Sequence, residues 1–393
     1  MQFVVLAAGR GRRLSPLTDV VPKPMLPVGS KPLLGHVADA AVEAGATELL
    51  FVVPSDDDTA RSHFGARHRG VPIEYVVQSE ANGTAGAVAC AAEHLEGPFV
   101  VLNGDNLYDA EALAEVVDRA PAIGVHAVSD PREYGVVSRD GDTVTGLVEK
   151  PAYPPTNLAN VGAYALPYLE PSAFEVATSD RGEREFTDVV GNVVEEYDVT
   201  PVEFDRWIDV GRPWELLRAN ELEIQSATRS IEGAVHDDAH LRGAVVVEDG
   251  AKVRERTTIE GPALVRSGAT VGPGAYVRGT TYVGENVTVG HGVEVKNSVL
   301  MADTSVGHLS YVGDSVLGQN VNLGAGTTTA NLRHDERPVE LTVQGERTST
   351  GRRKFGTVVG HGAKTGIDTS ILPGVTLSTG ATTFPGETVE KDR

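Results

Sequence analysis

Hydrophobic positions follow two different periods along the 393 residues. Up to residue 227, short apolar runs alternate with segments of helical spacing. The runs are FVVLAAG, ELLFVVP, IEYVVQ and PFVVLNGD, and the helical segments include PLLGHVADAAVEAGA and TAGAVACAAEHL. This alternation predicts a doubly wound, Rossmann-like α/β sheet, whose ligand site should lie at the carboxyl ends of the strands. The segment 213–227 also has helical spacing, and we expect it to close this half.

From about Ile231 an apolar residue recurs every six positions. The uninterrupted series is Val265, Val271, Val277, Val283, Val289, Val295 and Met301. It resumes at Leu317 after a phase slip expected between Gly307 and Tyr311, and it is interrupted at 329–357. Such a hexapeptide repeat predicts a left-handed parallel β-helix with its apolar residues pointing inward. We therefore expect two domains, 1–227 and 228–393. Because the prism has flat exposed sides, we also expect a homotrimer formed through the β-helix.

Composition narrows the expected partners and compartment. The net charge of −21 argues against a nucleic-acid partner, which binds through cationic groups. No run of 18 apolar residues occurs, so we expect no membrane span, and the N-terminus lacks the basic region and cleavage site of a signal peptide. The single cysteine, Cys90, cannot form an internal disulfide, so we expect a cytoplasmic protein. Only 8 of the 34 basic residues are lysine, which favours a halophilic source.

The stretch LAAGRGRRLSPLTDVVPKPMLPV directly follows the first predicted strand. Its glycines let backbone amides approach a ligand closely, and its cations add positive charge, as in a phosphate cradle. The residues concerned are Gly9, Gly11, Arg10, Arg12, Arg13 and Lys23. Leu14 stands where a dinucleotide fingerprint has its third glycine, and the P-loop motif is absent. The alternative interpretation is a solvated basic turn.

Six motifs of the first half then follow one another in the order of a known family. LAAGxGxRxxPLT…PKPMLPV, QSEANGTAGAV, LNGDNL, YGVV…GLVEKP, ANVGAYAL and WIDVGRPWELL resemble the sugar-1-phosphate nucleotidylyltransferases. The resemblance implies that a sugar-1-phosphate oxygen attacks the α-phosphorus of UTP or dTTP, with Arg13 and Lys23 as catalytic charges. It places nucleotide contacts at Leu6, Ala8, Gly9, Gly11, Gln78, Gly83 and Thr84.

The same resemblance implies a metal site and a sugar site. Asp105 in NGD and Asp209 in WIDVG would bind Mg²⁺, a cation that prefers oxygen ligands. Without the resemblance, Asp105 would be interpreted as a helix cap and Asp209 as a turn residue. The implied contacts to the sugar and its phosphate are Gly135, Glu149, Lys150 and Asn160.

One β-helix segment, VGHLSYVGDSVLGQNVNLGAGTTTANL, resembles the acetyltransferase site of the bifunctional N-acetylglucosamine-1-phosphate uridyltransferase/glucosamine-1-phosphate acetyltransferase family. The resemblance implies acetyl-CoA as acyl donor, His308 as general base and the backbone amide of Ala325 as oxyanion donor. Further implied site residues are Arg278, Lys296, Tyr311, Asn322, Asn331 and Arg337. Within 351–354, GRRK could bind acetyl-CoA phosphates or balance charge on a loop. His291 and His361 are expected to be solvated turn residues.

The whole pattern resembles the archaeal-type bifunctional sugar-1-phosphate nucleotidylyltransferase/acetyltransferases. We therefore expect acetylation of glucosamine-1-phosphate, followed by uridylyl transfer to N-acetylglucosamine-1-phosphate. One alternative is a glucose-1-phosphate uridylyl- or thymidylyltransferase whose β-helix only oligomerises or regulates. A second alternative is a non-catalytic scaffold subunit, although a scaffold has no need for the metal-binding carboxylates.

Overall fold

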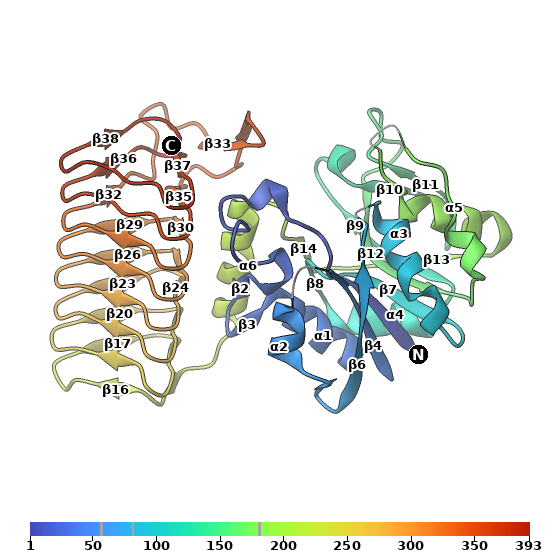
Figure 1. Cartoon of the computed structure of the whole chain (residues 1–393), viewed down its shortest axis with the longest axis horizontal. Helices are drawn as coiled ribbons and strands as arrows, with labels where there is room; N and C mark the ends of the chain where they lie inside the picture. Colours follow the sequence, from blue (N-terminus) through green and yellow to red (C-terminus); the bar gives the residue numbers. More distant parts are fainter. Residues whose placement is uncertain (56–57, 81, 180–181) are drawn as a thin grey trace. The chain divides into compact units, whose positions relative to one another are not determined.

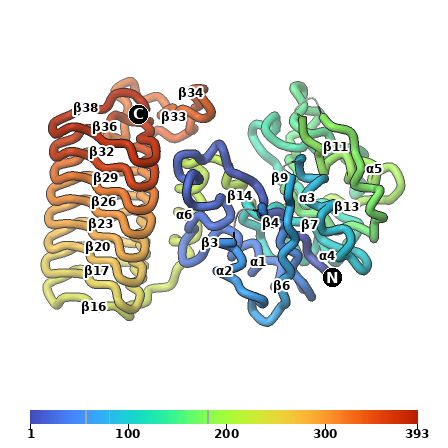
Figure 2. Tube along the Cα trace, in the orientation of Figure 1, coloured from blue at the N-terminus to red at the C-terminus, as the bar shows by residue number. Residues whose placement is uncertain are grey.

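A computed structural model describes residues 1–55, 58–80, 82–179 and 182–393, which form two compact units (Figure 1; Figure 2). The first unit consists of Met1–Arg10, Lys23–Met25 and Pro32–Asp209. The second unit consists of Gly11–Pro22, Leu26–Lys31 and Val210–Arg393. Within the described residues, no helix is long and apolar enough to cross a membrane.

The first unit is built on a ten-stranded mixed sheet in the order β11-β10-β12-β7-β1-β4-β6-β5, with β9 joining β12 to β13. The four predicted apolar runs are its parallel centre: β1 (Gln2–Leu6), β4 (Glu48–Pro54), β6 (Val71–Gln78) and β7 (Phe99–Asn103). The other strands are β5 (Arg67–His68), β9 (Ala122–Ala127), β10 (Gly135–Asp140), β11 (Thr143–Glu149), β12 (Leu158–Leu166) and β13 (Thr200–Glu203). The central strands are parallel, so their carboxyl ends share one edge of the sheet.

Helices cover both faces of this sheet, as a doubly wound fold requires. Phe3 and Val5 of β1 pack with α1 (Leu33–Glu43) and α4 (Ala110–Asp118). Val4, between them, points to the other face and packs with α3 (Thr84–Ala91) and α5 (Phe186–Glu196). The short elements α2 (Thr59–Phe64), β8 (Asn106–Tyr108) and β14 (Trp207–Asp209) also belong to this unit, whereas β2 (Pro27–Val28) belongs to the second unit and β3 (Lys31–Pro32) lies where the two units divide. The alternating pattern of β1 thus places a hydrophobic core on each side of the sheet.

The second unit contains the left-handed parallel β-helix, in which successive coils stack (Figure 1). Its three sides are parallel sheets, each built from strands of successive coils. The first sheet contains β15 (Ser230–Ile231), β18 (Val245–Val247), β21 (Ala263–Val265), β24 (Thr281–Val283), β27 (Val299–Leu300), β30 (Val316–Leu317), β35 (Val358–Val359) and β37 (Thr376–Leu377). The second contains β16 (Ala234–Val235), β19 (Lys252–Val253), β22 (Thr270–Val271), β25 (Thr288–Val289), β28 (Ser305–Val306) and β31 (Asn322–Leu323). The third contains β17 (His240–Arg242), β20 (Thr258–Glu260), β23 (Tyr276–Arg278), β26 (Glu294–Lys296), β29 (Tyr311–Gly313), β32 (Thr328–Thr329), β36 (Ser370–Ile371) and β38 (Thr388–Val389).

The inward valines of the hexapeptide series are fully buried in one core, but the predicted phase slip is misplaced. Val247 pairs with Val265 and Val265 with Val283, so these coils take 18 residues. Val283 then pairs with Leu300, not with Met301, and the coils shorten to 17 residues. The corner at Asn297 is one residue shorter than the corner at Gly279, against which it packs on the preceding coil. The slip therefore precedes His308 by two sides of the prism, β27 and β28.

The predicted interruption is confirmed as an excursion from one coil. Leu317 pairs directly with Val359, and the intervening chain includes the antiparallel hairpin of β33 (Glu340–Val343) and β34 (Glu346–Ser349). Leu332 and Lys354 form an antiparallel bridge at its base. The excursion is thus closed by its own pairing.

The predicted helix 213–227 is α6 (Pro213–Gln225), and it belongs to the second unit. Its Asn220 side chain accepts from the Gly29 amide at 2.9 Å and donates to the Pro27 carbonyl at 2.9 Å. These bonds hold the segment Leu26–Lys31 against α6. The compact units divide at 209–210, so α6 clusters with the second unit, while the domains 1–227 and 228–393 remain a prediction.

Candidate functional site

The predicted phosphate cradle begins where β1 ends. Leu6 closes the strand, and its carbonyl accepts from the Gly104 amide at 2.9 Å, so the NGD turn packs directly against the end of β1. Ala8 and Gly9 follow, and a side chain at Gly9 would meet no atom of the described residues within 4 Å. The open space beside Gly9 leaves its backbone accessible to a ligand.

In the second unit, the glycine-arginine motif at Gly11–Arg13 lies against the WIDVGRP motif at Gly211. Gly11 adopts left-handed φ and ψ of 60° and 35° immediately before the short 3₁₀ helix Arg12–Leu14. A side chain at Gly211, in the IDVGRP motif, would lie 2.8 Å from Arg13 Nη2 and 3.3 Å from Glu215 Oε2. The Arg13 guanidinium therefore lies against the bare backbone of Gly211, at the start of α6.

In the first unit, the two predicted metal ligands are brought together by a short β-ladder. Asp209 of β14 pairs with Asn106 of β8, the residue next to Asp105. The Lys23 ammonium is 5% exposed and forms an ion pair with Asp105, whose side chain is 30% exposed. Lys23 thus contacts Asp105, and the backbone of Asp209 pairs with the residue next to Asp105.

These carboxylates suit a divalent cation. Asp105 and Asp209 offer hard oxygen donors, the kind that Mg²⁺ prefers. In the described ranges no group of three or more His, Cys, Asp or Glu residues could hold a metal by itself. Two carboxylates can bind an octahedral Mg²⁺ that takes its other ligands from phosphate oxygens and water.

The predicted base-binding residues lie between β6 and α3. Gln78 ends β6 and donates to the Gly83 carbonyl at 3.3 Å. Gly83 has φ 99°, and a side chain there would lie 2.4 Å from the Arg184 carbonyl oxygen. The Thr84 hydroxyl accepts from the Phe186 amide at 2.9 Å and so also joins α3 to α5. Gln78, Gly83 and Thr84 therefore stand together at one strand-to-helix turn.

Three of the four predicted sugar contacts converge. Gly135 pairs with Glu149 across β10 and β11. A side chain at Gly135 would lie 3.0 Å from Glu149 Oε2 and 3.4 Å from Asn160 Nδ2. Asn160 donates to the Tyr164 hydroxyl, and burial raises the pKa of Tyr164, so this phenol stays neutral. Lys150 follows Glu149 with its ammonium 3.7 Å from the carboxylate.

Two further groups lie near Gly135 that were not predicted from the sequence. Thr187 lies 3.4 Å from the same Gly135 position, and its buried hydroxyl has no hydrogen-bond partner among the described residues. Trp207 stacks edge-on with Tyr134 at 5.2 Å. The sequence could have indicated Trp207, because this residue begins the WIDVG motif. Thr187, in the first turn of α5, had no sequence signal.

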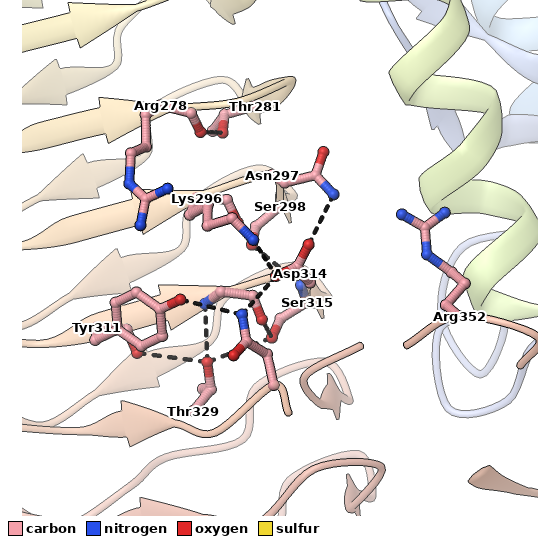
Figure 3. Close-up of polar contacts among 12 residues, drawn as sticks. Arg278, Thr281, Lys296, Asn297, Ser298, Tyr311, Asp314, Ser315, Thr329 and Arg352 are labelled. Carbon is pink, nitrogen blue, oxygen red and sulfur yellow. Dashed lines mark hydrogen bonds and ion pairs between the residues drawn. The ribbon is translucent and has the colours of Figure 1, made fainter. Parts of the chain in front are cut away.

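Three of the predicted acetyltransferase residues, Arg278, Lys296 and Tyr311, lie on successive strands of the third sheet of the β-helix (Figure 3). Arg278 and Lys296 pair in register on successive coils of the third sheet. Arg278 forms an ion pair with Glu294 at 2.7 Å, and Lys296 with Asp314 at 2.7 Å. Both predicted phosphate-binding cations are therefore already partnered by carboxylates.

His308 and Ala325 lie on adjacent coils at one corner. The His308 carbonyl accepts from the Gly326 amide at 2.8 Å. A side chain at Gly307 would lie 2.7 Å from the Ala325 nitrogen. The exposed Asn322 of β31 lies in register with Ser305 of β28, just before this corner. His308, Ala325 and Asn322 are thus neighbours, although no phase slip singles out His308.

The excursion contributes Asn331, whose amide donates to the Tyr311 hydroxyl at 3.1 Å. Arg337 lies further along on the exposed surface, with its amide bonded to Asp335 at 3.2 Å. Within the GRRK stretch, Arg352 pairs with the Glu221 carboxylate of α6. Of the two interpretations of GRRK, the ion pair of Arg352 with Glu221 favours charge balance over binding of acetyl-CoA phosphates.

Two of the predicted turn histidines differ in burial. His291 is exposed and its ring nitrogen lies 3.1 Å from the Pro273 carbonyl. His361 is only 4% exposed, which contradicts the expectation of a solvated residue. Its Nδ1 accepts from the Gln319 amide at 2.9 Å, and its Nε2 donates to the Leu17 carbonyl at 2.6 Å. His361 is buried because the segment Gly11–Pro22 covers this corner of the β-helix.

Comparisons with known proteins match the chain over its whole length. The Nucleotidyl transferase family model matches residues 2–226, and the GMPPB C-terminal domain model matches residues 259–355. The bifunctional protein GlmU of Methanococcus aeolicus is 37% identical over 100% of this chain and 96% of its own length. The bifunctional sugar-1-phosphate nucleotidylyltransferase/acetyltransferase of Sulfurisphaera tokodaii is 36% identical over 100% of this chain and 98% of its own.

Among solved structures, a Bacillus anthracis protein described as a glucose-1-phosphate thymidylyltransferase superposes with a TM-score of 0.52 at 27% identity. It covers 59% of this chain and 98% of its own length. This similarity supports the nucleotidyltransferase fold of the first half.

Proposed function

Because the chain belongs to the family of bifunctional sugar-1-phosphate nucleotidylyltransferase/acetyltransferases, we propose that it makes UDP-N-acetylglucosamine in two steps. It is a nucleotidyltransferase and an acetyltransferase. In the first step the β-helix transfers the acetyl group of acetyl-CoA to glucosamine-1-phosphate. In the second step the amino-terminal half joins N-acetylglucosamine-1-phosphate to the uridylyl group of UTP and releases pyrophosphate.

Nucleotidyl transfer is supported by the ion pair of Lys23 with Asp105 and by the β-ladder that brings Asp209 alongside Asn106, the neighbour of Asp105. We assign Mg²⁺ to the two carboxylates, where it would neutralise phosphate charge and orient the triphosphate. Lys23 is buried against Asp105 and supplies a further positive charge for the phosphates. Arg13 offers the fork geometry that suits phosphate oxygens. Catalysis at such a site is alignment and charge neutralisation.

We assign recognition of the sugar to Gly135, Glu149 and Asn160. Lys150 is assigned to bind the phosphate of the sugar-1-phosphate. The lack of a side chain at Gly135 leaves room beside Glu149 Oε2 and Asn160 Nδ2. Glu149 can accept from sugar hydroxyls, and Thr187 adds a hydroxyl that has no other partner among the described residues. We assign recognition of the nucleotide base to Gln78, whose side-chain amide can both donate and accept hydrogen bonds.

For acetyl transfer, His308 removes a proton from the sugar amine as the nitrogen attacks the thioester carbonyl. The new bond joins the amine nitrogen to the acetyl carbon, and the CoA thiolate leaves. The backbone amide of Ala325 is assigned to the transient oxyanion. Tyr311, Asn322, Asn331, Arg337, Arg278 and Lys296 are assigned to the sugar phosphate and its orientation.

Association into a homotrimer is proposed from the exposed apolar residues of the His308 corner. Leu309 is 70%, Ile367 54% and Phe384 78% exposed. They lie on coils joined through this corner, since the Asp368 amide bonds to Ala325 and the Gly386 amide to Ile367. Exposed apolar side chains aligned along one edge favour a protein partner. The expected cytoplasmic location and halophilic source remain predictions.

A pyrophosphate-release screen tests the second step. Glucose-1-phosphate, glucosamine-1-phosphate, galactosamine-1-phosphate and N-acetylglucosamine-1-phosphate are each offered with UTP or dTTP and Mg²⁺. We expect the highest kcat/KM for N-acetylglucosamine-1-phosphate with UTP. A clear preference for glucose-1-phosphate would contradict the pathway but not the reaction type.

Release of CoA thiol from acetyl-CoA and glucosamine-1-phosphate tests the first step. His308→Ala should lower kcat by about 10²–10⁴-fold, the usual contribution of a general base. His291→Ala is the matched control, because His291 lies at the same corner one coil earlier and is exposed. Thiol release that is absent, or unchanged in His308→Ala, contradicts the assigned mechanism.

A further inference from the structure

Asp314 has no assigned role, yet its carboxylate contacts two of the residues assigned to acetyl transfer. We propose that Asp314 is a positioning residue of the acetyltransferase site, which aligns Lys296 and Asn331 for a 2-amino sugar phosphate. This inference rests on the proposed acetyl transfer. Asp314 acts through these neighbours and is not itself assigned a contact with substrate.

Asp314 is the middle member of a ladder of corner residues. Lys296 pairs with Gly313 and Tyr311 with Thr328, so Asn297, Asp314 and Asn331 occupy equivalent corner positions on three successive coils. Asn297 and Asp314 have left-handed φ values of 46° and 49°, a conformation for which Asn and Asp are favoured among residues with side chains. The shortened corner of the 17-residue coils thus places one carboxylate between two amides.

The Asp314 carboxylate accepts hydrogen bonds from three side chains, those of Lys296, Asn297 and Asn331 (Figure 3). Its Oδ2 accepts from Lys296 Nζ at 2.7 Å and from Asn331 Nδ2, and its Oδ1 accepts from Asn297 Nδ2 at 3.0 Å. The side chain is only 5% exposed. A carboxylate so buried is retained only when charge and hydrogen bonds compensate its lost hydration. The positions of the Lys296 ammonium and the Asn331 amide are therefore coupled to one acceptor.

The coupling reaches the groups that face the substrate. Asn331 also donates to the Tyr311 hydroxyl at 3.1 Å. Lys296 follows Arg278 in the same outward column of the third sheet. A shift of Asp314 would therefore move the assigned cation, the amide and the phenol together.

The ladder is supported from behind by α6. Asn297 Nδ2 also donates to Glu221 Oε1 at 2.8 Å, and Arg352 of the excursion forms an ion pair with Glu221. The carboxylates of Asp314 and Glu221 are thereby balanced by the cations of Lys296 and Arg352. Partners behind a binding residue restrict its rotamers, which is how a supporting shell tunes a site.

Asp314→Asn tests the proposal with the full-length protein. The carboxamide keeps the shape but replaces one acceptor oxygen by an NH₂ group, which would face Lys296, Asn331 or Asn297 as donor against donor. We expect kcat/KM for glucosamine-1-phosphate in thiol release to fall by about 10–100-fold. Pyrophosphate release should stay within about twofold of wild type, since the site around Lys23 is untouched. Asp303→Asn is the control: Asp303 also has a left-handed φ of 60° and accepts from Asn286 at 3.2 Å, but it is exposed.

A double-mutant cycle separates positioning from a merely structural role. If Asp314 acts through Lys296, adding Asp314→Asn to Lys296→Met should lower kcat/KM by less than about threefold further, because interacting residues are not additive. Fully additive losses would overturn the proposal. So would wild-type thiol release in Asp314→Asn.

Two further results remain decisive. Should Asp314→Asn fail to fold, Asn297→Ser removes the amide between the two carboxylates, and a loss of about threefold or more in thiol release is expected for one hydrogen bond. No loss there overturns the proposal. If wild type releases no thiol, the acetyl-transfer proposal itself fails, and the role of Asp314 with it.

Discussion

Gly83 shows how one residue's backbone conformation shapes the assigned nucleotide site. Its φ of 99° and ψ of 179° lie in a region that is essentially restricted to glycine. A side chain would also lie 2.4 Å from the Arg184 carbonyl oxygen. Gly83→Ala should therefore destabilise the protein by about 1–3 kcal/mol and raise KM for the nucleotide, because the turn beside Gln78 must move.

Thermal melting and nucleotide titration measure this change. About 1 kcal/mol corresponds to a Tm shift of roughly 2–4 °C for a domain of this size. Gly146→Ala is the control, since a side chain at Gly146 meets no atom within 4 Å in the part of the chain that the structure describes. Equal Tm and KM for Gly83→Ala and the control would show that the turn tolerates the change.

At the scale of elements, the β-helix anchors the segment Gly11–Pro22, which carries Arg13. Besides the His361 bond to Leu17, the Thr379 hydroxyl donates to Asp19 at 2.8 Å. His361→Ala leaves the Leu17 carbonyl and the Gln319 amide without their partner, at a cost of about 1–3 kcal/mol. We expect KM for the nucleoside triphosphate to rise by about tenfold, because precise placement of Arg13 is lost.

Steady-state kinetics of both reactions check this prediction. Thiol release should stay close to wild type in His361→Ala, since His308 and Ala325 lie at a different corner. A change confined to thiol release, with KM for the triphosphate unaltered, would show that the anchored segment does not position Arg13.

At the scale of the whole molecule, the exposed apolar corner predicts self-association. Leu309→Asp combined with Phe384→Asp places charges where apolar contacts between chains are expected. Light scattering during gel filtration should report the mass of three chains for wild type and of one chain for the double variant. Pyrophosphate release should persist in the separated chain. A monomeric wild type would overturn the trimer.

Much of the architecture could be predicted from the sequence because its periods are local. The apolar runs became the parallel centre of the first sheet, and the valines six apart became the buried column of the β-helix. The phase slip was misplaced because Leu300 and Met301 are both apolar and buried, so hydrophobicity alone could not decide which one stacks on Val283. That α6 clusters with the second unit depends on what α6 contacts, which its helical spacing does not encode.

The sequence by itself determined the fold of each half and which residue types are available for chemistry. These follow from the spacing of apolar residues and from ordered motifs, which are properties of neighbouring positions. Only the tertiary structure decided which distant side chains meet: Asp209 beside Asp105, Arg13 against Gly211, His361 under Leu17, and Asp314 between Lys296 and Asn331. Burial and hydrogen bonding arise from contacts between segments far apart in the chain, and no local pattern encodes them.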